Sequence, residues 1–334
     1  MIADSELPPS SIPIFTTLAA LRKWRNAAFA EGKSVGFVPT MGALHKGHLS
    51  LVHHSLVQND LTVVSIFVNP TQFAPHEDLS SYPRTLPQDL DALSTLRGPS
   101  KRTPSAIFLP SVDVMYPSSA KDGAQLQTGA FVEVKGIGEV MEGRSRPAFF
   151  RGVATVVTKL FNAVQPSHAY FGQKDIQQAL LLRRMVADLL LAYPTEQTLH
   201  VIPTTRSSVP GDCELALSSR NAYLTPEERV YAPTLYSALQ AAERAWNEGR
   251  PKAHAVRAAV GVLETEALAA NDAGVKMRLD YVEMNDPWTF DIINDAETMN
   301  SGEGRAFILS GAMWVGKTRL IDNILLGDSG KILY

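Results

Sequence analysis

A run of apolar residues at positions 61–68, Leu-Thr-Val-Val-Ser-Ile-Phe-Val, restricts the fold of this chain more than any other segment. A strand that is apolar without alternation is buried on both faces, as in parallel sheets covered by helices. Further extended segments are predicted at 34–38, 107–109, 168–171 and 198–202, with helices at 18–31, 49–57, 152–164 and 175–191. This alternation predicts an α/β fold with a Rossmann-like, doubly wound parallel sheet.

The pattern changes after Asn221. Residues 225–228, Thr-Pro-Glu-Glu, predict a helix start, with a capping threonine, proline at the first position and acids in the first turn. Two alanine-rich helices are predicted at 226–248 and 251–271, then strands at 279–284, 306–309 and 318–324 and a flexible loop at 293–304. We therefore expect a flexible leader at 1–13, a Rossmann-like domain at 14–222 and a smaller α+β domain at 223–334.

The composition excludes several classes of protein. The chain has 334 residues and a formal net charge of −3, and no basic stripe stands out, so we expect no nucleic-acid partner. No apolar run approaches the roughly 18 residues of a membrane span, and residues 1–13 lack the features of a secretion signal. We therefore expect a cytoplasmic protein that does not associate with membranes. A single cysteine, Cys213, excludes an internal disulfide and a zinc site built on several thiolates.

The strongest chemical signal lies at residues 39–48, Pro-Thr-Met-Gly-Ala-Leu-His-Lys-Gly-His. A predicted buried strand enters a glycine-bearing turn and then a helix, whose first amides and dipole favour phosphate. His45 and His48 are three residues apart, so both can donate hydrogen bonds to charge developing on one phosphate. The alternatives are two surface histidines or a metal site, but the glutamate and downstream ligands of a zinc hydrolase are missing.

Five later stretches complete a pattern of six motifs. They are residues 67–73 (Phe-Val-Asn-Pro-Thr-Gln-Phe), 82–85 (Tyr-Pro-Arg-Thr), 171–178 (Phe-Gly-Gln-Lys-Asp-Ile-Gln-Gln), 217–224 (Leu-Ser-Ser-Arg-Asn-Ala-Tyr-Leu) and 316–323 (Gly-Lys-Thr-Arg-Leu-Ile-Asp-Asn). In order and spacing, the six motifs resemble the pantothenate synthetase (pantoate–β-alanine ligase) family of the His-x-Gly-His nucleotidyltransferase superfamily. The resemblance covers nearly the whole chain after about residue 14.

The resemblance implies an AMP-forming carbon–nitrogen ligase that condenses pantoate with β-alanine through a pantoyl-adenylate. It implies ATP as co-substrate with Mg²⁺, no organic prosthetic group, a homodimer, and a C-terminal domain that closes over the site. The matching catalytic residues are His45, His48, Lys174, Ser219 and Arg220. Those assigned to ATP also include Thr40, Met41, Gly42, Gly47, Gly172, Asp175 and Ser218. Those assigned to the other substrates are Asn69, Gln72, Tyr82, Arg146 and Gln178, and those assigned to the metal are Asp89 and Asp175.

Several of these residues make physical sense without the resemblance. Asn69 and Gln72 follow the carboxyl end of the buried strand, where open α/β sheets bind ligands, although a turn cap and a solvated side chain are the alternatives. Lys174 suits ATP phosphates, and Asp175 suits either a helix N-terminus or a magnesium shell. Residues 218–221, Ser-Ser-Arg-Asn, offer hydroxyls and a guanidinium for phosphate.

A second phosphate-binding pattern occurs near the C-terminus. Residues 311–318, Gly-Ala-Met-Trp-Val-Gly-Lys-Thr, match the P-loop consensus letter for letter. The residues after Thr318 predict a strand, whereas a P-loop opens a long helix. We therefore predict no P-loop here, and a P-loop NTPase that depends on Lys317 is the least favoured alternative.

Two positions depart from the family pattern. Phe149 stands where the family has histidine, and Glu214 replaces a glycine in a lengthened loop at 207–214. These departures are the only support for a catalytically impaired ATP-binding relative. Another nucleotidyltransferase-superfamily enzyme is the remaining alternative, but it should not need Asn69, Gln72 and Gln178 together.

Overall fold

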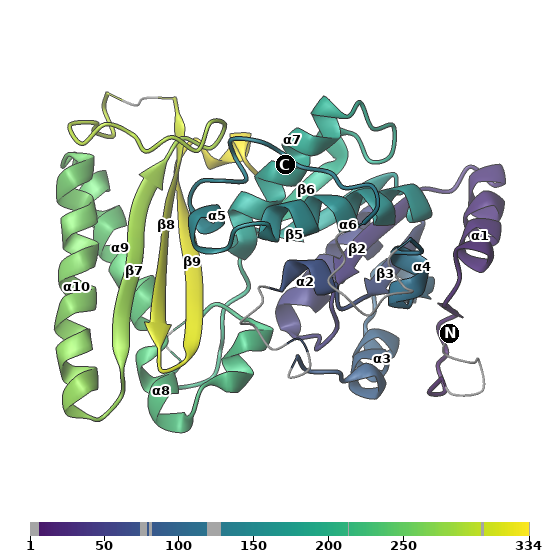
Figure 1. Ribbon diagram of the computed structural model, residues 1–334, viewed down its shortest axis with the longest axis horizontal. Coiled ribbons are helices and arrows are strands. Elements are labelled where there is room, and N and C mark those ends of the chain that lie inside the picture. Colours follow the sequence, from purple (N-terminus) through teal and green to yellow (C-terminus); the bar gives the residue numbers. More distant parts are fainter. Residues whose placement is uncertain are drawn as a thin grey trace. The chain divides into compact units, whose positions relative to one another are not determined.

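The computed structural model describes residues 7–73, 79, 82–118, 128–212, 214–301 and 304–333 (Figure 1). Cys213, part of the predicted leader and part of the predicted loop at 293–304 lie outside the described residues. The chain divides into two compact units, the first comprising Met1–Gly172 and Gln177–Ile202 and the second Gln173–Ile176 and Pro203–Tyr334. Residues 203–222, assigned to the first domain from the sequence, thus group by their contacts with the second unit.

The first unit is built on a six-stranded sheet in the order β1-β4-β3-β2-β5-β6. All its neighbouring strands pair in parallel, which confirms the predicted doubly wound architecture. The strands are β1 (Ile14–Phe15), β2 (Val35–Thr40), β3 (Leu61–Ile66), β4 (Ala106–Phe108), β5 (His168–Gly172) and β6 (Leu199–Ile202). In β3 every residue after Leu61 is buried, as the apolar run predicted.

Helices connect these strands. They are α1 (Leu18–Ala30), α2 (Lys46–Gln58), α3 (Leu86–Thr95), α4 (Val112–Met115), α5 (Glu142–Ser145), α6 (Phe149–Val164) and α7 (Ile176–Asp188), with short 3₁₀ turns η2 (Pro70–Gln72), η4 (Pro99–Lys101) and η6 (Glu196–Thr198). From β2 the chain moves through α2 to β3, and from β5 it moves through α7 to β6 in the opposite direction across the sheet. Since such crossovers are right-handed, α2 and α7 cover opposite faces of the sheet.

The strand order reverses between β2 and β5, and ligands bind at such switch points in open α/β sheets. Pro39 helps to separate β2 from β5 at this switch point. β2 pairs with β3 up to Thr40, but its pairing with β5 ends at Phe37, two residues before the proline. Proline has no N–H to donate, so the ladder toward β5 cannot continue through it. The strand was predicted to end at Val38, before the proline, but it runs through Pro39 to Thr40.

The second unit joins a three-stranded antiparallel sheet to helices. Its elements are the 3₁₀ turns η5 (Gln173–Asp175), η7 (Ser219–Tyr223) and η8 (Ser329–Lys331), the helices α8 (Pro226–Tyr231), α9 (Thr234–Asn247) and α10 (Lys252–Asp272), and the strands β7 (Met277–Asn285), β8 (Ala306–Val315) and β9 (Thr318–Gly327). Trp246 of α9 and Phe307 of β8 are almost fully buried and meet edge to face in its core. The α+β character predicted for this region is confirmed.

Two predicted boundaries in this unit were wrong. The helix expected at 226–248 is interrupted at Ala232, because Pro233 cannot donate the hydrogen bond that would continue α8. The strand expected at 306–309 continues to Val315, since its partners on β7 and β9 extend that far.

The segment that matches the P-loop consensus is a β-hairpin. Residues Gly311 to Val315 belong to β8, and Val315 pairs with Thr318 of β9 across a tight turn at Gly316 and Lys317. Gly316 has a φ of +57°, which suits the turn. Backbone amides engaged in a ladder cannot surround a phosphate, so the hairpin excludes a P-loop. Among the described residues, no helix has the length and apolar character that crossing a bilayer requires.

Candidate active site

The turn after β2 is held by hydrogen bonds to its own residues and to α3. The hydroxyl of Thr40, itself buried, donates to the carbonyl of Ser65 at 2.7 Å and accepts the N–H of Gly42 at 3.2 Å. Gly42 has a φ of +83° and Ala43 one of +50°, so two consecutive residues adopt the left-handed conformation. The chain thereby reverses within a few residues and delivers His45 to the start of α2.

Asp89 of α3 fixes this turn through hydrogen bonds to its backbone. Its Oδ2 accepts the N–H of Ala43 at 3.0 Å, and its Oδ1 accepts the N–H of Leu44 at 2.8 Å and the hydroxyl of Thr85 at 3.1 Å. Burial raises the pKa of the Asp89 carboxyl, while these three hydrogen bonds act in the opposite direction. Both oxygens are thus engaged and the side chain is 2% exposed, so the geometry favours a structural role over the predicted magnesium role.

His45 and His48 form the N-terminus of α2. Nδ1 of His45 accepts the N–H of Gly47 at 3.1 Å, and Nδ1 of His48 accepts the N–H of His45 at 3.4 Å. A ring nitrogen that accepts carries no proton, so in each neutral imidazole the proton lies on Nε2. The ring centroids are 4.1 Å apart. The fold therefore presents two Nε2–H donors side by side at a positive helix end, as charge on a phosphate requires.

Asn69 is 1% exposed and supports Gln72 from within the protein. Its Nδ2 donates to Oε1 of Gln72 at 2.9 Å, and its Oδ1 accepts the hydroxyls of Tyr116 at 2.7 Å and Thr71 at 3.0 Å. Burial raises the pKa of Tyr116, which stays a neutral donor to Asn69. With Oε1 of Gln72 occupied, its Nε2 remains the group that suits a carboxylate or hydroxyl. Asn69 therefore positions Gln72, and its own contact with a substrate stays a prediction.

The residue that departs from the family, Phe149, contacts a predicted site residue. The guanidinium carbon of Arg146 lies 3.8 Å from the centroid of the Phe149 ring, a cation–π contact, and its Nη2 donates to the backbone carbonyl of Gln72 at 3.0 Å. A Cβ on Gly152 of the same helix would lie 2.3 Å from the carbonyl oxygen of Thr71. α6 and η2 are thus in close backbone contact, and the Phe149 ring helps to hold the Arg146 guanidinium.

In the second unit, one cavity brings together the phosphate-binding side chains predicted in two separate motifs. Its lining includes Lys174 of η5 and Ser218 and Arg220 at the start of η7, with Asp322 in the wall. The Lys174 side chain is 15% exposed, and its Nζ lies 4.0 Å from Oδ1 of Asp175. Ser218 caps η7 by accepting the N–H of Arg220 at 3.2 Å. Two cations and a hydroxyl at one cavity form a suitable site for an anion.

The lengthened loop before η7 is closed by paired charges. Arg229 donates to both oxygens of Asp212 at 2.9 and 2.8 Å, and this guanidinium lowers the pKa of the Asp212 carboxyl. Ser207 also donates to Asp212, and its N–H donates to the carbonyl of Leu215 at 2.8 Å. Glu214 has a φ of +63°. The family's glycine at this position is thus explained, since the fold keeps the left-handed conformation although this chain places glutamate there.

The remaining predicted residues lie on the following elements. Met41 precedes the two histidines, Gly47 lies between them in the sequence, and Gly172 ends β5. Tyr82 meets Phe73 edge to face, with centroids 5.7 Å apart. Gln178 lies on α7, partly exposed, and Ser219 begins η7. In the part of the chain that the structure describes, no three His, Cys, Asp or Glu side chains group as a metal site requires.

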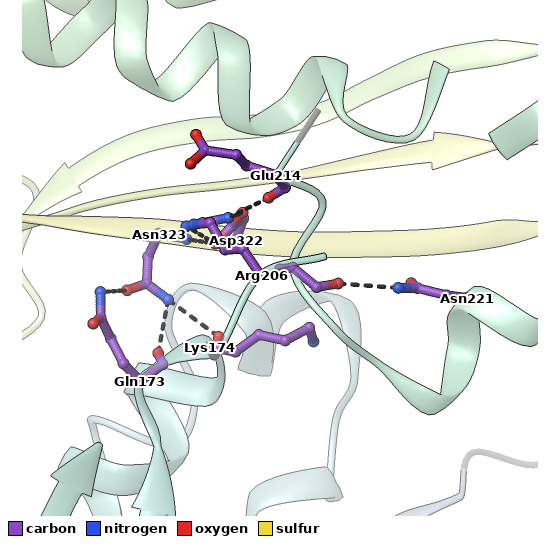
Figure 2. Close-up of polar contacts among 8 residues, drawn as sticks. Gln173, Lys174, Arg206, Glu214, Asn221, Asp322 and Asn323 are labelled. Atoms are coloured by element: carbon purple, nitrogen blue, oxygen red, sulfur yellow. Dashed lines mark hydrogen bonds and ion pairs between the residues drawn. The ribbon is translucent and has the colours of Figure 1, made fainter. Parts of the chain in front are cut away.

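Sequence reasoning missed two buried amides that support the site. Gln177, 3% exposed, donates to the carbonyls of Ile137 and Val140 and accepts the N–H of Glu142, which fixes the segment before Arg146. Asn323, 2% exposed, holds the turn that carries Lys174 (Figure 2). Both belong to motifs noted in the sequence, but nothing in a linear pattern indicates which residues their amides contact.

The first unit joins a doubly wound parallel sheet to a histidine pair at the helix N-terminus beside its switch point. This combination defines the class of His-x-Gly-His nucleotidyltransferases. Within that class, a sequence profile described as pantoate-beta-alanine ligase matches residues 13–325. The chain therefore belongs to the pantoate-beta-alanine ligase family.

Individual relatives agree with this assignment over 94% of this chain. The pantothenate synthetase of Moorella thermoacetica is 46% identical over 94% of this chain and 98% of that protein. The crystal structure of pantothenate synthetase from Thermus thermophilus matches with a TM-score of 0.77 and 38% identity, over 94% of this chain and 99% of that one. The pantoate-beta-alanine ligase of Francisella tularensis, complexed with beta-gamma ATP and beta-alanine, matches with a TM-score of 0.68 and 32% identity, over 94% and 98%.

Proposed function

We propose that this protein condenses pantoate with β-alanine to pantothenate at the expense of ATP, which leaves as AMP and pyrophosphate. The observation that carries the proposal is the pair of Nε2–H donors that His45 and His48 present at the N-terminus of α2. The relatives' names and the ATP and β-alanine of the Francisella tularensis complex support the choice of substrates.

In the first step, a carboxylate oxygen of pantoate attacks the α-phosphorus of ATP. The bond to the bridging oxygen breaks, and pyrophosphate leaves with the bonding electrons, so pantoyl-adenylate forms. We assign His45 and His48 to the charge that develops on the phosphate, and Lys174, Ser218, Ser219 and Arg220 to the phosphates. The protein's contribution is to position the reactants and neutralise charge.

In the second step, the amine of β-alanine attacks the acyl carbon, AMP leaves with the bonding electrons, and a proton is released. Gln72 orients pantoate with its Nε2, since its Oε1 accepts from Asn69. Arg146, held by the Phe149 ring, offers a cation to a substrate carboxylate. Gln178 and Tyr82 stay predicted substrate contacts, and Met41, Gly42, Gly47 and Gly172 stay predicted ATP contacts.

Mg²⁺ supplies charge neutralisation on the ATP phosphates when it is bound. Asp175 fits this ion, because its carboxylate is about half exposed (49%) on the turn that carries Lys174. Asp89 does not fit, since its two oxygens already accept three hydrogen bonds inside the protein. The homodimer and the cytoplasmic location stay predictions.

The test is pantoate-dependent exchange of labelled pyrophosphate into ATP, with Mg²⁺ and without β-alanine. His48→Ala should lower the exchange rate by about 10²-fold, as the loss of one donor to developing charge does. His53→Ala is the matched control, because His53 is an exposed histidine on the same helix. Wild-type protein that binds ATP but shows no exchange with pantoate would contradict the proposal, and exchange with another acid would redirect it.

A further inference from the structure

Two adjacent polar side chains on β9 are buried, and neither was predicted as a site residue. Asp322 is 5% exposed and Asn323 2% exposed, at the end of the motif at residues 316–323. β9 is an edge strand of the three-stranded sheet, so its outer side is available to other segments. Figure 2 shows that the two side chains reach two different segments of the second unit.

Asn323 holds the turn η5 through hydrogen bonds. Its Nδ2 donates to the backbone carbonyls of Gln173 at 2.9 Å and of Lys174 at 3.1 Å, and its Oδ1 accepts from Nε2 of Gln173 at 3.2 Å. One amide thus makes three hydrogen bonds within two consecutive residues. The backbone from which the Lys174 side chain departs is fixed relative to β9.

Asp322 holds the segment before η7 through an ion pair with Arg206. Its Oδ2 accepts from Nη1 of Arg206 at 2.7 Å and its Oδ1 from Nη2 at 3.2 Å, a two-pronged ion pair. The guanidinium also lies 3.4 Å from the centroid of the Tyr236 ring and donates to the carbonyl of Glu214 at 3.2 Å. Arg206 is bridged to Ala216, two residues before Ser218. Asp322 therefore fixes the start of η7.

The two segments held in this way, η5 and the start of η7, line one cavity with Lys174 and Arg220, respectively. Asp322 also lines it, but its charge is paired with Arg206. Arg319, a third cation in the lining, is paired with Asp280. Because Asp322 is neutralised by Arg206, its carboxylate does not offset Lys174 and Arg220.

We propose that Asn323 and Asp322 are positioning residues that hold Lys174 and Arg220, respectively, in the geometry that binds the ATP phosphates. The proposal rests on the proposed function for the identity of the anion. Neither side chain needs to touch ATP. Each acts on one phosphate-binding segment, so their effects should be separable.

Crossed double-mutant cycles test this separation, with the Kd of Mg·ATP measured by titration calorimetry without acid substrate. Asn323→Ala should raise the Kd about tenfold in the wild-type background but less than about twofold when Lys174→Ala is present. Asp322→Asn should depend on Arg220→Ala in the same way, and each variant should be additive with the other segment's cation. Asn285→Ala is the matched control, because Asn285 is a fully buried amide of the same sheet that donates to the carbonyl of Phe290.

The outcomes separate the proposals. Additive effects in all four cycles, or an equal rise in Kd from Asn285→Ala, would overturn the positioning roles. If Asn323→Ala does not fold, Asn323→Ser, which keeps one donor, should give a smaller rise with the same dependence on Lys174. Wild type that binds ATP but shows no exchange with pantoate would overturn the proposed function alone, since the Kd cycles still decide the positioning. Wild type that does not bind ATP would overturn both.

Discussion

The glutamate at position 214 should make this protein less stable than the glycine that it replaces. Glu214 has a φ of +63°, and its side chain is exposed without a hydrogen bond or ion pair of its own among the described contacts. A left-handed conformation costs an L-residue about 1–2 kcal/mol. Glycine avoids this cost but loses about 0.5–1 kcal/mol more conformational entropy on folding. Glu214→Gly should therefore raise the free energy of unfolding by about 0.5–1 kcal/mol.

Urea unfolding followed by tryptophan fluorescence measures this change. Three of the four tryptophans, Trp246, Trp288 and Trp314, lie in the second unit with Glu214, so the signal reports mainly on that unit. The midpoint should rise without a change in the slope of the free energy against urea. Glu214→Ala should change little, because alanine has the same backbone strain as glutamate.

Gly274→Ala is the control of opposite sign. Gly274 has a φ of +79°, and an added Cβ would meet nothing within 4 Å, so only the backbone strain changes. It should destabilise the unit by about 1 kcal/mol. A Glu214→Gly variant no more stable than wild type, or an equal gain from Glu214→Ala, would refute the argument from backbone strain.

Three further predictions concern the first unit. Gly152→Ala should destabilise by about 2 kcal/mol or more in thermal melts, because its Cβ would lie 2.3 Å from the backbone carbonyl of Thr71 and backbone cannot swing aside; an unchanged melting temperature would contradict the close packing. Asp89→Asn should lower the rate of pyrophosphate exchange without unfolding the protein. The amide has one oxygen in place of two, so it cannot accept the N–H groups of both Ala43 and Leu44 in the turn before His45. An unchanged exchange rate would contradict the structural role of Asp89. Burial, and secondarily the charge of His200, lowers the pKa of His168. The stability that its neutral form contributes should be present above about pH 6.5 and lost as pH falls below it. His168→Gln should weaken that dependence in unfolding measured between pH 5 and 7.5, and an identical pH profile would contradict it.

Phe149 stands where the family has histidine. From the sequence, the missing histidine raised the alternative of an impaired enzyme. The phenylalanine instead meets the Arg146 guanidinium face on, a contact that holds the cation without an ionisable ring. Phe149 therefore contacts a predicted substrate residue, and the catalytically impaired relative stays an alternative that the pyrophosphate exchange measurement tests.

The sequence by itself determined the fold class and the elements that carry the phosphate chemistry. The apolar run of β3, the alternation of strands and helices, and the turn at residues 39–48 are local patterns, and backbone preferences and burial act on them locally. The same locality explains why the P-loop match could be rejected: the residues after Thr318 have strand character, and they form β9. Local patterns also failed locally, since Pro233 divided a helix that alanine content had predicted as continuous.

Only the tertiary structure decided which side chains hydrogen-bond to the turns that carry the site residues. Asp89 binds a turn 45 residues earlier in the chain, and Asn323 binds a turn 149 residues earlier. Contacts of this separation depend on where strands and helices come to lie, and the sequence of a single chain contains no local signal for them. The orientation of the histidine rings was likewise settled by hydrogen bonds to Nδ1 that the folded helix N-terminus supplies. The sequence indicated the reactive side chains. The packing of the fold determined where the protons of the histidine rings lie and which residues position the reactive side chains.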